Sequence, residues 1–118
     1  MANILVVDDE ELDQLGLTAM LEGAGHTVIL ATSGQEAVRL YLEHTIHVVV
    51  TDIVMPAGDG LDLISRLRSI KPDAAIIAVS GKGRSGLSAA RSIGANHVFE
   101  KPVVPEDLVK AVAIALGR

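Results

Sequence analysis

Short apolar runs alternate along the chain with longer stretches in which apolar residues recur every three or four positions. The short runs are typical of strands buried on both faces of a parallel sheet, and the periodic stretches are typical of helices. Strands are predicted at residues 3–7, 27–31, 48–52, 74–79 and 96–99. Helices are predicted at about 11–23, after Ser33, from Leu61 to before Pro72, at 87–93, and from Pro105 onward.

Residues at the helix ends support these bounds. Ser33 and Glu36 have the spacing of a capping box, Gly23 stands at the end of the first helix, and Pro105 suits the first position of the last one. The expected apolar stripes are Leu12, Leu15, Ala19 and Met20 in the first helix, Ala37, Leu40 and Tyr41 in the second, and Leu108, Val109, Val112 and Leu116 in the last.

Strands that alternate with helices predict right-handed crossovers and a parallel sheet covered on both faces. Two doubly wound strand orders are compatible with this pattern, and five short βα units favour the flavodoxin-like order 2-1-3-4-5. We therefore expect one α/β domain over residues 1–118. In that order Asp8, Asp9 and Asp52 converge at the carboxyl ends of neighbouring strands, flanked by Ser80 and Lys101.

Composition excludes several classes of function. The net charge is −5, and one Tyr and one Phe provide no aromatic platform for stacking bases, so no nucleic-acid partner is expected. The absence of cysteine excludes disulfides and thiolate metal sites. The apolar runs are too short to span a membrane, and the acidic start does not suit a signal peptide. We expect a cytoplasmic protein without a membrane partner.

Three carboxylates at one sheet edge repel one another unless a cation intervenes. Oxygen ligands favour Mg²⁺, with Mn²⁺ as a possible substitute. Asp52 is then placed to act as a nucleophile and become an acyl phosphate. Mg²⁺ and Lys101 would neutralise the oxygens of the transferring group, and the Ser80 hydroxyl could donate a hydrogen bond to it.

Each of these residues also has an ordinary explanation when it is taken alone. Asp8 and Asp9 could be solvated capping residues, Asp52 and Ser80 could be turn residues, and Lys101 could be a surface lysine. Their order along the chain, with each at a strand end on one edge, favours a common site.

With the acid pair Asp8-Asp9, Asp52 followed by Met55-Pro56, Ser80, and Lys101-Pro102, the sequence resembles the receiver domain of two-component response regulators. The resemblance implies that Asp52 accepts a phosphoryl group from a phosphohistidine on a sensor histidine kinase or phosphotransfer protein. It also implies Mg²⁺ binding by Asp9 and Asp52, supported by Asp8 and the Val54 backbone carbonyl. Ser80 and Lys101 would then bias a target-binding face made by the fourth helix, fifth strand and fifth helix. Such a protein is a phosphoacceptor and not a conventional enzyme.

The chain departs from the family pattern at Val98, where Tyr or Phe is usual; Phe99 follows and should point to the opposite face. The loop 81–86 (GKGRSG) is rich in glycine and basic residues. We expect it to be mobile without phosphate and to bring Lys82 or Arg84 to the phosphoryl group. Val54 and Lys82 lie beside the expected path of an attacking water, and since Val54 cannot orient a water, slow self-dephosphorylation is predicted.

Two other classes of function stay open. Gly81, Gly83 and Gly86 form a literal GxGxxG between a strand and a helix, as in dinucleotide-binding enzymes, although no second mononucleotide half follows. An interaction module of the same fold that is never phosphorylated is the third possibility. No output domain is recognisable, so a signal would leave through a protein contact, and the start at Met1 slightly favours a stand-alone regulator. The basic residues Lys82, Arg84 and Arg91 could form a partner surface or a solvated face.

Overall fold

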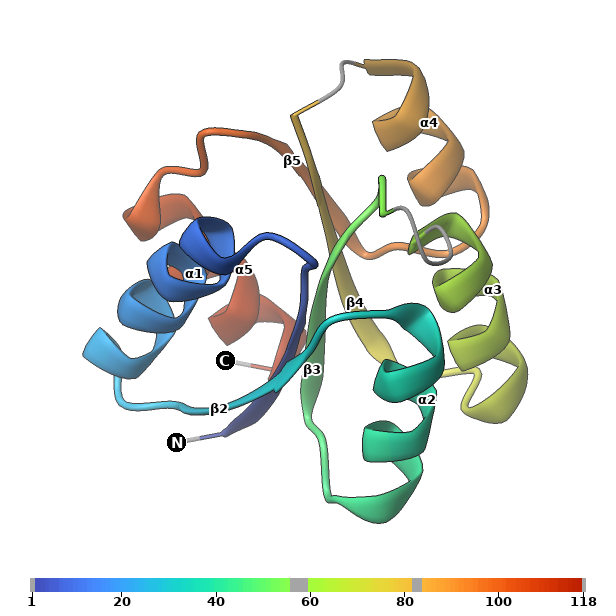
Figure 1. The fold of residues 1–118 in the computed structure, drawn as a ribbon, viewed down its shortest axis with the longest axis horizontal. Helices are drawn as coiled ribbons and strands as arrows, with labels where there is room; N and C mark the ends of the chain where they lie inside the picture. Colours follow the sequence, from blue (N-terminus) through green and yellow to red (C-terminus); the bar gives the residue numbers. More distant parts are fainter. Residues whose placement is uncertain (1, 56–59, 82–83, 118) are drawn as a thin grey trace.

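The computed structural model describes residues 2–55, 60–81 and 84–117. Five parallel strands form one sheet in the order β2-β1-β3-β4-β5, which confirms the predicted flavodoxin-like topology (Figure 1). The strands are β1 (Asn3–Val7), β2 (Thr27–Ala31), β3 (Val48–Asp52), β4 (Ala75–Ser80) and β5 (His97–Glu100). The helices are α1 (Glu11–Gly23), α2 (Gly34–Glu43), α3 (Gly60–Ile70), α4 (Arg84–Ser92) and α5 (Pro105–Ala115).

The helices cover both faces of the sheet, and each face has its own core (Figure 1). Alternate residues of β1 face different cores. Leu5 belongs to the core that includes residues of α2, α3 and α4, and Ile4 belongs to the core that includes residues of α1 and α5. All five residues of β3 are buried. The central strands therefore form a rigid frame whose carboxyl ends can hold side chains in fixed positions.

The predicted apolar stripe of α1 is wrong at Leu12, Leu15 and Ala19, which are exposed, whereas Met20 packs against the core as predicted. Leu17 and Leu21 are its buried residues, while the Leu12 and Leu15 side chains are 83% and 58% exposed. Apolar residues occupy several sides of this helix, so periodicity alone selected a stripe rotated away from the sheet. In α5, Leu108 and Val112 are buried as predicted, whereas Val109 is only half-buried.

Other local predictions differ by a few residues. Helix α4 begins at Arg84, three residues before the predicted start at Leu87, so the last three residues of the predicted glycine-rich loop belong to the helix. The Ser33 cap is confirmed, since its Oγ accepts a hydrogen bond from the Glu36 amide at 3.2 Å. In return, the Glu36 carboxylate accepts a hydrogen bond from the Thr32 amide at 2.7 Å, one residue before the cap.

Helix α3 starts very close to the end of β3. The Gly60 amide donates to the Ile53 carbonyl at 2.7 Å. A Cβ at position 60 would overlap the Asp52 carbonyl oxygen and lie 2.8 Å from the Ile53 Cα. Glycine is required here by this close approach and not by an unusual φ. Among the described residues, none of the helices has the length and apolar character needed to cross a membrane.

Candidate functional site

The predicted carboxylates meet at the carboxyl edge of the sheet. Asp8 follows β1 directly, Asp52 ends β3, and the register pairs Val7 with Thr51. One carboxylate oxygen from each of Asp8, Asp9 and Asp52 lies within 4.8 Å of the others. Asp8 and Asp52 are buried, whereas Asp9 is exposed. Two of the three acids are therefore fixed by the sheet, and the third faces solvent.

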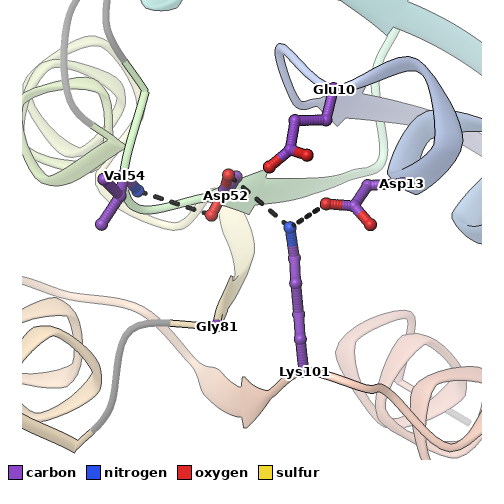
Figure 2. Close-up of a pocket in the computed structure, with 6 residues that line it drawn as sticks. All are labelled: Glu10, Asp13, Asp52, Val54, Gly81 and Lys101. Atoms are coloured by element: carbon purple, nitrogen blue, oxygen red, sulfur yellow. Dashed lines mark hydrogen bonds and ion pairs between the residues drawn. The ribbon is translucent and has the colours of Figure 1, made fainter.

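Lys101 crosses to these carboxylates from the loop after β5. Its Nζ lies 2.7 Å from Asp13 Oδ2, 3.0 Å from Asp8 Oδ2 and 3.6 Å from Asp52 Oδ2. Figure 2 shows the side chain extending into the gap between Asp52 and Asp13. Burial opposes the charged form of Lys101, but the hydrogen bonds to Asp13 and Asp8 and the charge of Asp52 outweigh it and raise the pKa of the ammonium. Lys101 is therefore a fixed positive charge in the site.

The environment of Asp52 is unfavourable for its negative charge. Burial raises the pKa of Asp52, and the nearby charge of Asp8 acts in the same direction. Lys101 and the backbone amides of Val54 and Ile53 oppose this rise in pKa without cancelling it. The Val54 amide lies 3.4 Å from Asp52 Oδ1. A further cation beside Asp52 would favour the ionised form, which is the nucleophilic one.

These groups line a surface depression of about 250 Å³. The residues around it are Glu10, Asp13, Asp52, Val54, Gly81 and Lys101 (Figure 2). The Val54 side chain is 46% exposed at this rim. Ser80 is buried and ends β4, one residue beyond the register partner of Asp52, and its carbonyl accepts the Lys101 amide at 2.8 Å. Ser80 and Lys101 therefore lie side by side next to the acid cluster.

The donor chemistry of the cluster suits a hard divalent cation. Asp8, Asp9 and Asp52 offer only carboxylate oxygens, which Mg²⁺ and Mn²⁺ accept. Asp8 is also held by the Lys101 ammonium and by the Glu10 amide at 2.9 Å, so its free acceptor capacity is limited. Asp9 is the acid best placed to contact an ion from the solvent side. The Val54 carbonyl stays a predicted ligand.

Two residues of the depression were missed by the sequence analysis. Glu10 and Asp13 lie before and within the first turn of α1, where acidic residues are already explained by the helix dipole. A signal was present: a helix that follows β1 directly must begin at the same edge of the sheet as Asp8 and Asp9. Its first-turn side chains could therefore reach the site.

The structure tests only part of the predictions on modulating residues. Val98 packs with the core on the α2–α4 face and Phe99 with the opposite core, which confirms that they point to different faces. Lys82 and Gly83 lie outside the described residues, as does the side chain of Arg84. The predictions of loop mobility and of a basic contact to phosphate fall on this segment.

Comparison with known proteins gives one consistent result. The sequence profile of the response regulator receiver domain matches residues 4–113. Chemotaxis protein CheY of Thermotoga maritima is 35% identical, covering 92% of this chain and 92% of that protein. Protein PilH of Pseudomonas aeruginosa is 36% identical, with 99% of each chain covered. Transcriptional regulatory protein PdtaR of Mycobacterium tuberculosis is 32% identical, and this chain spans 57% of its length.

Solved structures agree with the sequence matches. A response regulator receiver domain protein from Clostridium thermocellum superposes with a TM-score of 0.93 at 35% identity, covering 100% of this chain and 96% of that chain. The beryllofluoride-activated NtrC4 receiver domain superposes with a TM-score of 0.91 at 33% identity. The similarity therefore includes the sheet edge that carries the acid cluster.

Proposed function

The chain belongs to the response regulator receiver domain family, and we propose that Asp52 is its phosphoacceptor in a Mg²⁺-dependent signalling reaction. The observation that carries this proposal is the position of Asp52. Its carboxylate opens into the depression, is held by the Val54 amide and lies 3.6 Å from the Lys101 ammonium. A turn aspartate without such a role would gain nothing from a buried, acid-crowded position at the sheet edge.

In the proposed reaction an Asp52 carboxylate oxygen attacks the phosphorus of a phosphohistidine on a sensor histidine kinase or phosphotransfer protein. A new O–P bond forms, the P–N bond breaks, and the imidazole nitrogen keeps the electron pair and takes a proton from solvent. A Mg²⁺ ion held by Asp9 and Asp52, with support from Asp8 and the Val54 carbonyl, would supply positive charge beside the transferring oxygens. Lys101 would pair with one phosphoryl oxygen, and the Ser80 hydroxyl would donate to another.

The output of this reaction would be a change in a protein-binding face. Ser80 ends β4, and the segment after it leads into α4, while Lys101 follows β5 and leads into α5. Movement of these two residues toward a phosphoryl group would therefore shift the face made by α4, β5 and α5. With Val98 in place of an aromatic residue, α4 would carry more of this change than side-chain rotation on β5.

The phosphoacceptor assignment is tested by intact mass after incubation with acetyl phosphate and Mg²⁺. We expect an adduct of about 80 Da that is absent with EDTA and absent in Asp52→Asn. Asp107→Asn removes an exposed carboxylate from the first turn of α5 and serves as the matched control, which should keep the adduct. An adduct that persists in Asp52→Asn would contradict the assignment. No adduct in the wild-type protein would favour an unphosphorylated interaction module.

Metal binding is tested separately by calorimetry at millimolar Mg²⁺. Asp9→Asn should weaken the binding, because it removes the solvent-facing carboxylate of the cluster. Titration with NAD in the same buffer tests the dinucleotide alternative, which the acidic lining of the depression disfavours. NAD binding that excludes Mg²⁺ would overturn the proposed site.

A further inference from the structure

Asp13 makes the closest contact to the Lys101 ammonium. Its Oδ2 lies 2.7 Å from Nζ, nearer than the oxygens of Asp8 at 3.0 Å and Asp52 at 3.6 Å. Asp13 stands in the first turn of α1 and lines the same depression as Asp52 (Figure 2). Its side chain is 36% exposed, compared with 18% for Lys101. The contact is therefore open to the solvent from which a phosphoryl group would enter.

The geometry divides the hydrogen bonds of Lys101 unequally. Two of the three N–H donors of the Lys101 ammonium serve Asp13 and Asp8, while Asp52 Oδ2 lies 3.6 Å from Nζ, at ion-pair distance. A phosphoryl oxygen on Asp52 would draw the ammonium toward Asp52 and away from the position in which Asp13 and Asp8 hold it. The contact with Asp13 is the one that opens at lower cost, because Asp13 is partly exposed and water can hydrate its carboxylate. Asp8 is fully buried, and its charge would be left without a cationic partner.

We propose that Asp13 is a positioning residue that holds Lys101 away from the phosphoryl position while Asp52 is unmodified. This inference rests on the proposed function of Asp52. A contact that is present in one state and broken in the other shifts the equilibrium by its own free energy. Asp13 therefore lowers the tendency of the protein to adopt the phosphorylated arrangement. A phosphoryl group on Asp52 would have to supply the free energy needed to break the contact between Asp13 and Lys101.

Beryllofluoride with saturating Mg²⁺ provides the test, because it places a phosphoryl mimic on the aspartate without a covalent donor. Amide NMR titration of the isotope-labelled full chain measures its apparent dissociation constant. Asp13→Asn should bind beryllofluoride about two- to fivefold more tightly than wild type, the size expected for a partly exposed charged contact. Asp13→Glu, which restores a carboxylate, should bind more weakly than Asp13→Asn.

Two controls separate this effect from charge and from folding. Glu11→Gln removes one exposed negative charge from the same helical turn, so it reports the general gain from lower repulsion of the anion. In a Lys101→Met background, Asp13→Asn should give no gain beyond that of Glu11→Gln in the same background. The side-chain carbon shifts of Lys101 in the absence of beryllofluoride should change in Asp13→Asn and not in Glu11→Gln.

The outcomes are distinguishable. If Asp13→Asn binds beryllofluoride as Glu11→Gln does, or more weakly than wild type, the proposed holding role is wrong, and weaker binding would mean that Asp13 supports Lys101 in both states. If Asp13→Asn gains affinity but keeps the gain without Lys101, the contact is not its cause and the inference fails. A wild-type protein that takes up neither beryllofluoride nor a phosphoryl group would overturn the proposed function together with this inference.

Discussion

Lys101→Met is the substitution that most directly tests the electrostatics of the site. Methionine keeps an unbranched apolar stem but removes the ammonium that contacts Asp8, Asp13 and Asp52. Asp8 is fully buried and would then retain the Glu10 amide without its cationic partner. We expect the metal-free protein to lose stability, because removing one member of a buried charged group leaves the others uncompensated.

The expected loss in the free energy of unfolding follows from the three contacts of the Lys101 ammonium. The 3.0 Å bond to the buried Asp8 contributes about 2 kcal/mol, as expected for a charged hydrogen bond. The partly exposed Asp13 and the more distant Asp52 contribute about 0.5 kcal/mol each. The desolvation cost of the ammonium, which methionine avoids, offsets about 1 kcal/mol. The net loss is about 2 kcal/mol, or about 8 °C in the melting temperature of a domain this size.

Urea unfolding followed by far-UV circular dichroism measures this loss in EDTA and again at saturating Mg²⁺. The variant should gain more stability from Mg²⁺ than the wild type gains, because Nζ no longer competes with the ion for Asp8. A tenfold tighter Mg²⁺ site would add about 1.4 kcal/mol. Lys110→Met removes an exposed lysine from α5 and should change neither quantity.

Two results would refute this reasoning. If Lys101→Met is as stable as wild type in EDTA, the Lys101 contacts do not offset the repulsion within the acid cluster. If the variant and the wild type gain equally from Mg²⁺, the ammonium and the ion do not share Asp8.

The remaining predictions concern other parts of the site and the core. Gly60→Ala should cost about 2 kcal/mol of stability in thermal or urea unfolding, because its Cβ would overlap the Asp52 carbonyl; unchanged stability would mean that α3 shifts freely. Val54→Asn should shorten the lifetime of the phosphorylated protein at least about threefold by orienting a water, as measured by loss of the mass adduct; an equal lifetime would contradict this role. Leu21→Ala should destabilise the protein by about 3 kcal/mol in urea unfolding, whereas Leu15→Ser should change stability by less than about 0.5 kcal/mol; equal effects would contradict the observed face of α1.

The strand order could be predicted because the local signals agree with one another. Runs such as Val48–Val50 are too apolar for an exposed strand, and each is separated from the next by a helical pattern. The face of α1 could not be predicted in the same way. Leu12, Leu15, Leu17 and Leu21 occupy more than one side of the helix, and only contact with the sheet selects among them.

In the site, too, the residues at strand ends could be predicted from the sequence, whereas the contact made by a helix residue could not. Asp8, Asp52 and Lys101 could be placed together because each directly follows or ends a strand, and parallel strands end at one edge. The sequence brings Asp13 to this edge with the first turn of α1, but its contact with Lys101 could not be predicted, because the direction of its side chain depends on how α1 leaves the sheet. Sequence order brought the three acids and Lys101 to one edge, while the structure shows that Asp13 also contacts the Lys101 ammonium there.

The charges at this edge explain why the metal and the phosphoryl group are expected to act together. When ionised, the acid cluster and the acidic residues that line the depression carry five negative charges: Asp8, Asp9, Glu10, Asp13 and Asp52. Lys101 is the one cationic residue among the described residues that line the depression. Conversion of Asp52 to an acyl phosphate adds negative charge, because a phosphoryl group carries about two charges where the carboxylate carried one. A phosphoryl oxygen would compete with Asp8 and Asp13 for the position of the Lys101 ammonium. A divalent cation near Asp8 and Asp9 would compensate the negative charge of this acid pair. It would also weaken the attraction between Asp8 and the Lys101 ammonium, which could then move toward the phosphoryl group. The proposed phosphoacceptor would therefore need Mg²⁺ for the charge balance of its own side chains as well as for the transfer reaction.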